Sequence, residues 1–283
     1  MGKTLSFYGR RDAVPMVWIP EQKFACFVLN VTHLILPPGE LWFCRVFNQV
    51  LPQIQNAKLQ QEVKKFVAQE GAHARGHRRV LDAYEAAGWD FSVSKNRLNR
   101  IFEHLLGDKM LGRWRTKPAG RRRWLRMRVG MIAAIEHVTC VLGSWILENH
   151  SIAQAGADQR MLNLLLWHGA EEVEHRAVAF DLYRELGGGY WGRVFWFALA
   201  VCVIVLTWTR GTQAFIRQDQ ARCGNQSRFG FSAYVRASRD GFLPSVGFLM
   251  KSFLRYVRWG YHPSVEGNDL LAEATLKKLA TGQ

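Results

Sequence analysis

A short stretch in the second half of the chain, Trp167 to His175, carries imidazole and carboxylate side chains at helical spacing. His168, Glu172 and His175 stand at positions i, i+4 and i+7. Because each residue of an α-helix advances by roughly 100°, these three side chains fall within an arc of about 60°. Imidazoles and carboxylates on one face of a helix are typical of a metal site.

A second stretch repeats this pattern earlier in the chain, with Glu70, His73 and His77 at i, i+3 and i+7. Bundles that hold two iron or manganese ions take a Glu-x-x-His pair from each of two helices and one Glu from each of the other two. The single glutamates are present, since Glu40 lies 30 residues before Glu70 and Glu136 lies 36 residues before Glu172. The sequence therefore predicts six metal ligands: Glu40, Glu70, His73, Glu136, Glu172 and His175.

The same spacing indicates a degenerate duplication in which each half is a helix, a reversal and a second helix. We expect an all-α fold, with a four-helix bundle over residues 39–189 and additional C-terminal helices over residues 190–283. Residues 1–38 are expected to cover the bundle, because Pro37-Pro38-Gly39 is typical of a helix start. The bundle helices are expected at about 39–51, 57–87, 121–150 and 158–186.

The charges of the six ligands indicate how many metal ions they bind. Four buried carboxylates without counter-ions would be strongly unfavourable and would take up protons instead. Two divalent cations cancel the four negative charges if both histidines are neutral. The donor atoms suit two iron ions, and manganese and zinc fit as well.

Three further residues near these ligands are candidates for catalytic roles. His77 and His168 share the ligand faces and are predicted to be additional ligands or to orient the carboxylates. Glu171 is a candidate base. His137 points about 100° away from Glu136, so we expect it to lie in the core or outside the ligand set.

The C-terminal third is apolar and basic, and the whole chain has a formal net charge of +15. Residues 194–206 form an apolar run that is short for a membrane span, although residues 190–209 would reach a suitable length. Residues 113–128 hold eight positive charges and no acid. These features favour an anionic membrane surface as a partner. Nucleic acid is not expected, because no nucleic-acid-binding motif accompanies the charge.

The five cysteines stand singly among mostly apolar neighbours, without any Cys-x-x-Cys spacing. This usage does not indicate a disulfide framework. The first apolar run follows two arginines and two prolines and lacks a small-residue cleavage site, which does not fit a signal peptide. We therefore expect a cytoplasmic protein that is peripheral on, or anchored in, the inner membrane.

Several of these motifs together resemble the bacterial "predicted metal-dependent hydrolase" family: Pro38-Gly39-Glu40, Gln69-Glu70-Gly71-Ala72-His73, Trp167-His168, Glu171-Glu172-Val173-Glu174-His175 and Gly260-Tyr261-His262-Pro263. The four helices are in turn similar to ferritin-like di-iron carboxylate proteins. That resemblance implies the same six ligand positions. The family name implies hydrolysis, whereas the ligand set resembles that of oxygen-activating enzymes.

Two enzymatic functions are consistent with this set of predicted metal ligands. In the first, a di-iron centre activates O₂ with the help of an electron donor and hydroxylates, desaturates or N-oxygenates a small, hydrophobic organic substrate. In the second, a binuclear centre delivers hydroxide to an ester or amide, with Glu171 or a bridging glutamate as the base. A third interpretation, a non-enzymatic metal-binding or membrane-associated scaffold, does not explain the paired imidazoles.

Overall fold

The computed structural model describes residues 13–108, 118–224 and 229–281, and no strand occurs within these ranges. The predicted all-α class is confirmed. The main helices are α1 (Lys23–Val50), α2 (Ala57–Ala86), α3 (Ser92–Asn99), α4 (Pro118–Glu148), α5 (Ser151–Gln154), α6 (Gln159–His175), α7 (Val178–Glu185), α8 (Tyr190–Cys223), α9 (Phe231–Arg239), α10 (Val246–Tyr256) and α11 (Asp269–Thr281).

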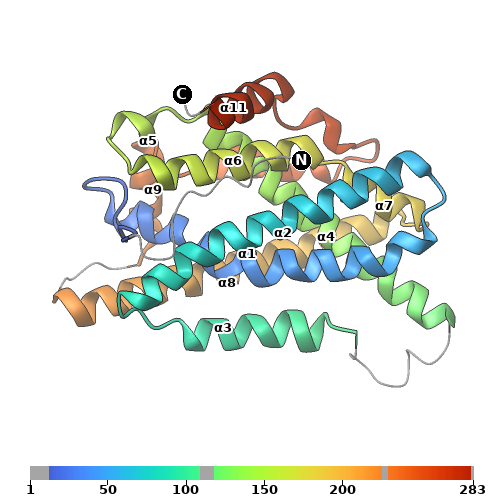
Figure 1. Ribbon diagram of the computed structural model, residues 1–283, viewed down its shortest axis with the longest axis horizontal. Coiled ribbons are helices and arrows are strands. Elements are labelled where there is room, and N and C mark those ends of the chain that lie inside the picture. The colour runs from blue at the N-terminus through green and yellow to red at the C-terminus, as the bar shows by residue number, and fades with distance from the viewer. Residues whose placement is uncertain (1–12, 109–117, 225–228, 282–283) are drawn as a thin grey trace.

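Two helical hairpins form the centre of the molecule. The 3-10 turn Leu51–Gln53 connects α1 to α2, and the short helix α5 connects α4 to α6. Within each hairpin the two long helices pack together, and the hairpins meet where α1 contacts α4 and α2 contacts α6. Figure 1 shows these helices running along the longest axis of the molecule. The relationship of this arrangement to ferritin-like proteins stays a prediction.

The ends of α2 and α6 follow from local sequence signals. Asn56 accepts hydrogen bonds from the backbone N–H groups of Lys58 and Leu59, and Asp158 caps α6 in the same way. Such caps satisfy backbone donors that have no partner inside the helix. Gly88 follows α2 with a φ of 88°, a conformation that glycine adopts without strain. The expected extent of this helix is therefore confirmed to within one residue.

Helix α1 corrects the expected start of the first bundle helix. It begins at Lys23 and continues through Pro37 and Pro38, so the boundary proposed at residue 38 falls inside a helix. Each internal proline costs a helix about 3 kcal/mol. Burial of large side chains on both sides, such as Phe27 and Phe47, contributes about 1.5–3 kcal/mol each and outweighs that cost. Pro37 and Pro38 therefore lie inside the helix and do not mark its start.

The last bundle helix is also different from the single helix expected over residues 158–186. It is divided into α6 and α7 by a turn at Arg176 and Ala177, directly after His175. The Arg176 guanidinium donates a hydrogen bond to the carbonyl of Val173 and pairs with Asp269 of α11. The pairing with Asp269 involves a segment far away in the chain, and the local sequence contains no glycine or proline at the break.

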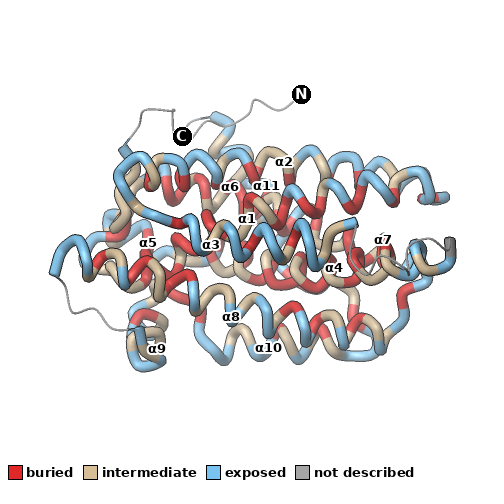
Figure 2. The backbone as a smooth tube through the Cα atoms, turned by 90° about the horizontal axis from the view of Figure 1, so that it is seen from below, coloured by how far each residue is buried: buried red, intermediate tan, exposed pale blue. Residues whose placement is uncertain are grey.

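Three helices are long and apolar enough to cross a membrane: Lys23–Gln53, Ala119–Glu148 and Tyr190–Cys223. The first two have 61% and 72% of their most apolar window buried inside the protein, so their apolar residues form its core. Only 17% of the corresponding window of α8 is buried. Figure 2 shows α8, α9 and α10 along one edge of the molecule, with exposed segments on their outer side.

The basic segment predicted over residues 113–128 lies partly in the described structure. Arg113, Arg115 and Lys117 lie outside the described residues. Arg121 and Arg122 are exposed on the first turns of α4 and line a pocket of about 540 Å³ together with Gln49, Gln53, Asp108, Trp124, Leu125 and Arg128. None of the residues that line this pocket is a predicted metal ligand.

Candidate metal centre

The six predicted ligands lie together inside the two hairpins, and all are buried. Helix α1 supplies Glu40, α2 supplies Glu70 and His73, α4 supplies Glu136, and α6 supplies Glu172 and His175. Their ligand atoms form two groups, each within a span of 4.8 Å: Glu40, His73 and His168 in one, and Glu70, Glu136, Glu172 and His175 in the other. His168 therefore lies among the candidate ligands.

Two glutamates lie between the two groups. Oε1 of Glu70 is 3.4 Å from Nδ1 of His73 and 3.2 Å from Nε2 of His175. Oε1 of Glu172 is 3.0 Å from Nε2 of His168, 3.6 Å from Nε2 of His175 and 3.7 Å from Nδ1 of His73. Each carboxylate thus faces imidazoles of both groups.

The hydrogen-bonding state of the cluster tests whether metal ions fit it. Both carboxylate oxygens of Glu40, Glu70 and Glu136, together with Nδ1 of His73 and Nε2 of His175, are buried without a hydrogen-bond partner among the described residues. Buried polar atoms are normally paired, because leaving them unpaired is costly. Converging oxygen and nitrogen atoms of this kind match the donors that divalent iron, manganese or zinc prefer. The residues present therefore fit a binuclear metal centre.

The pKa values of the glutamates and histidines in the cluster reflect their burial and their closeness to one another. Burial, and then repulsion by the neighbouring carboxylates Glu70 and Glu172, raises the pKa values of Glu40 and Glu136 well above the usual range for glutamate. Burial alone would lower the pKa of His73, but its interactions with Glu171 and Glu70 raise that pKa to about 10. Without cations, the protein compensates for the buried negative charge with protons.

Residues around the cluster hold the ligands in place. Glu171 accepts a hydrogen bond at 2.9 Å from Nε2 of His73, which leaves Nδ1 of that imidazole facing the cluster. Thr139 of α4 donates a hydrogen bond to Oε2 of Glu172. Nδ1 of His175 lies 3.4 Å from the amide oxygen of Gln69. Partners of this kind fix the ring orientation of a metal-binding histidine and raise its basicity.

A row of three buried imidazoles leads away from the first group of ligands. Nδ1 of His168 lies 2.8 Å from Nε2 of His77, and Nδ1 of His77 lies 2.8 Å from Nδ1 of His33. Burial, followed by the positive charge of neighbouring imidazoles, lowers the pKa of His77 well below its usual value and that of His33 to about 3. These two rings are therefore neutral, and each can donate one hydrogen bond and accept another.

His33 was missed at the sequence level, although a signal for it exists. It stands seven residues before Glu40, and the same separation relates Glu70 to His77 and His168 to His175. The interpretation of Pro37 and Pro38 as a helix start separated His33 from Glu40. Because α1 continues through both prolines, the two side chains share a face.

His137 lies outside the ligand set, as its angular offset from Glu136 indicated. Its Nδ1 is 2.8 Å from the hydroxyl of Tyr261, and its Nε2 is 3.2 Å from the hydroxyl of Ser252. It thereby connects α4 to α10 and to the segment that precedes α11. Through Tyr261, the motif Gly260-Tyr261-His262-Pro263 thus contributes a contact to α4 that does not involve the predicted ligands.

The geometry of this site agrees with what comparison with protein families shows. The chain belongs to the predicted metal-dependent hydrolase family. The model of this family matches residues 4–267, a range that contains every candidate ligand. Neither the curated proteins nor the solved structures contain a match to the chain. Metal dependence therefore rests on two independent findings, the family and the buried ligand cluster.

Proposed function

We propose that this protein is an enzyme with two divalent cations, one held by Glu40, His73 and His168 and the other by Glu136 and His175, with Glu70 and Glu172 between them. The observation that carries the proposal is the set of eight buried ligand atoms without hydrogen-bond partners among the described residues. Without a cation, burial of these unpaired polar atoms would be energetically unfavourable.

Hydrolysis is the type of reaction that the family supports, and an ester or amide is the substrate class that we propose. Two bound cations would act as Lewis acids toward the carbonyl group and would lower the pKa of a water molecule. The carboxylate of Glu70 or of Glu172, each of which faces imidazoles of both groups, would accept the proton of that water. The position of Glu171 suits the orientation of His73 better than the role of base. Its carboxylate is already engaged in the hydrogen bond that orients the ring of His73.

An apolar substrate is supported by the aromatic rings beside the ligands. The ring of Phe66 lies 4.7 Å from that of His175, and the ring of Trp167 lies 4.8 Å from that of His73. Aromatic walls around a few converging polar groups are typical of sites for small organic molecules.

Activation of O₂ is the second candidate, and the composition of the ligand set favours it. Four glutamates and two Glu-x-x-His histidines from four helices match the donor set of di-iron carboxylate bundles. Two ferrous ions would supply electrons to O₂, and the four carboxylates would balance their charge. A hydrophobic substrate and an external electron donor belong to this alternative.

One experiment separates these functions. Metal-free protein is loaded with Zn²⁺, Mn²⁺ or Fe²⁺, its metal content is measured by mass spectrometry, and it is assayed for hydrolysis of p-nitrophenyl esters and anilides and for O₂ uptake. Glu136→Gln is compared with Glu148→Gln, because both residues lie on α4 but Glu148 is exposed. Metal-dependent hydrolysis that is lost only in Glu136→Gln supports the hydrolase. Iron-dependent O₂ uptake without hydrolysis supports the alternative, and failure to bind any metal would refute both.

A further inference from the structure

The outer face of α8 is an exposed apolar surface. Its inner face is buried through Phe197, Phe215 and Ile216, and the helix packs on α1 and α4. On the outer side, Trp191 is 75% exposed and Phe195 is 59% exposed. Further exposed residues follow along the same helix: Leu199, Cys202, Val203, Val205 and Leu206. Apolar patches of this extent on a protein surface usually mark a binding site.

Helix α10 extends this surface. Val246, Met250 and Leu254 are exposed at intervals of four residues, so they lie along one side of the helix. Helix α10 is fixed against α8 by the rings of Phe197 and Phe253, whose centroids are 5.3 Å apart. At one end, the exposed ring of Trp259 lies 4.4 Å from that of Tyr190. Figure 2 shows both helices on the same edge of the molecule.

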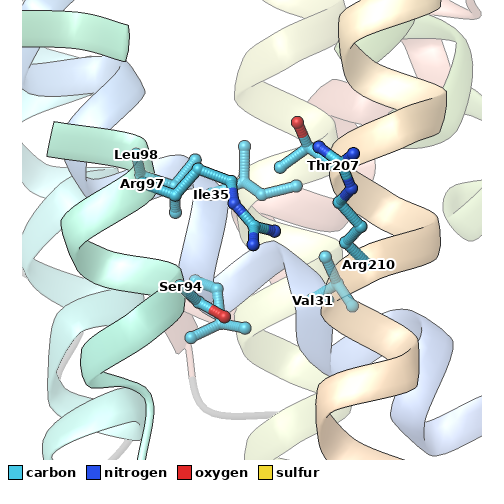
Figure 3. Close-up of a pocket in the computed structure, with 9 residues that line it drawn as sticks. Val31, Ile35, Ser94, Arg97, Leu98, Thr207 and Arg210 are labelled. Carbon is cyan, nitrogen blue, oxygen red and sulfur yellow. The ribbon is translucent and has the colours of Figure 1, made fainter. Parts of the chain in front are cut away.

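The charges around this surface have one sign. Neither residues 190–210 nor residues 246–258 contain an aspartate or a glutamate. Arg210 and Arg217 of α8, Lys251 of α10 and Arg258 just beyond it are exposed. Figure 3 shows Arg210 opposite Arg97 of α3 across a small pocket, so positive charge gathers where the apolar face of α8 ends. An apolar face with tryptophans and basic residues at its margins complements an anionic lipid bilayer.

We propose that the surface formed by α8 and α10 docks on a membrane that contains anionic lipids, with α8 lying in the plane of the interface. The inner side of α8 rules out a lipid environment on all sides. Its Arg193 is buried and donates a hydrogen bond to the carbonyl of Arg258, and its Asp219 is buried beside Lys23. A span over residues 190–209 would expose Arg193 to hydrocarbon, whereas docking by the outer face leaves both charged groups in place.

The test uses the full chain and vesicles of phosphatidylcholine, with or without about 30% phosphatidylglycerol. Binding is measured by co-sedimentation, and self-association without lipid is measured by analytical ultracentrifugation. We expect Phe195→Asp to lower binding to the anionic vesicles by about tenfold or more. We expect Leu270→Asp, a matched change at an exposed leucine of α11, to leave binding unchanged. Replacement of Arg210 and Lys251 by Gln is expected to reduce the preference for anionic vesicles several-fold.

Three results would overturn the proposal. The first is that the wild type does not bind anionic vesicles. The second is that Phe195→Asp and Leu270→Asp bind equally well, with helix content equal to that of the wild type. The third is that Phe195→Asp disrupts a dimer but leaves lipid binding intact, which would assign the surface to a second copy of the chain. None of these readouts depends on metal content or turnover, so the metal-centre proposal stands or fails separately.

Discussion

Replacement of Glu136 by glutamine should remove the stabilisation that metal ions give to the fold. A cation present at 100 times its dissociation constant, and bound only by the folded state, stabilises that state by about 2.7 kcal/mol. Unfolding entropy of about 2.1 cal/mol/K per residue amounts to about 0.6 kcal/mol/K for 283 residues. Each bound cation should therefore raise the melting temperature by roughly 4–5 °C, and two cations by roughly 9 °C.

Glutamine keeps the size of Glu136 but removes its charge. Burial, and then repulsion by Glu172 and Glu70, raises the pKa of Glu136 well above its usual range, so the charged form is unfavourable in the metal-free protein. We expect Glu136→Gln to melt at or above the temperature of the metal-free wild type, and to lose at least half of the increase on adding metal. Differential scanning calorimetry with and without chelator measures both quantities.

The control variant is Glu148→Gln, at an exposed position on the same helix. It should retain the full increase in melting temperature upon metal addition. Equal losses in both variants would refute the assignment of Glu136 as a ligand. A wild-type melting temperature that is insensitive to both metal and chelator would refute the metal centre itself.

Three other predictions concern the surroundings of the ligands and the helix packing. Glu171→Gln weakens the acceptor of His73 Nε2–H, so we expect about 10- to 100-fold lower affinity for one of two cations, measured by competition with a chromogenic chelator. His77→Ala removes the partner of His168 and should lower affinity for one cation by a similar factor, while the second stays bound in metal analysis by mass spectrometry. Gly143→Ala should destabilise the protein by about 1–3 kcal/mol in urea unfolding, because its Cβ would lie 2.7 Å from the carbonyl oxygen of Gly169.

Each of these predictions has a result that contradicts it. Wild-type affinity in Glu171→Gln would mean that its hydrogen bond does not orient His73. Loss of both cations in His77→Ala would indicate a general collapse of the site rather than a local effect on His168. Unchanged stability of Gly143→Ala would show that α4 and α6 can separate at no cost.

Helical periodicity predicted part of the candidate ligand set, namely the two Glu-x-x-His pairs. Glu40 and Glu136 were inferred from their matching offsets, and His168 was predicted only as an additional ligand or an orienting group. Glu70 and His73 share a face of any α-helix, and so do Glu172 and His175. The apolar residues that continue each of these faces predict amphipathic helices that bury it. The all-α class, the extent of α2 and the position of His137 outside the cluster follow from the same local rules.

Other features were decided only by contacts between distant segments. The course of α1 through Pro37 and Pro38 depends on burial of its flanks in the core, which outweighs the local preference of proline. At the break after His175, Arg176 pairs with Asp269, 93 residues further along the chain, a contact that local sequence does not indicate. The pairing of Glu171 with His73 also joins two helices, and periodicity on either helix alone does not specify it.

The sequence by itself thus determined which side chains share a face of each helix, because residues three, four and seven apart on a helix lie on one side. The tertiary structure determined how they are divided. It placed Glu70 and Glu172 between two groups of ligands, and it brought both His168 and His33 close to His77. These relations depend on the relative depth and rotation of packed helices, which are set by side-chain packing over the whole core and not by the spacing within any one helix.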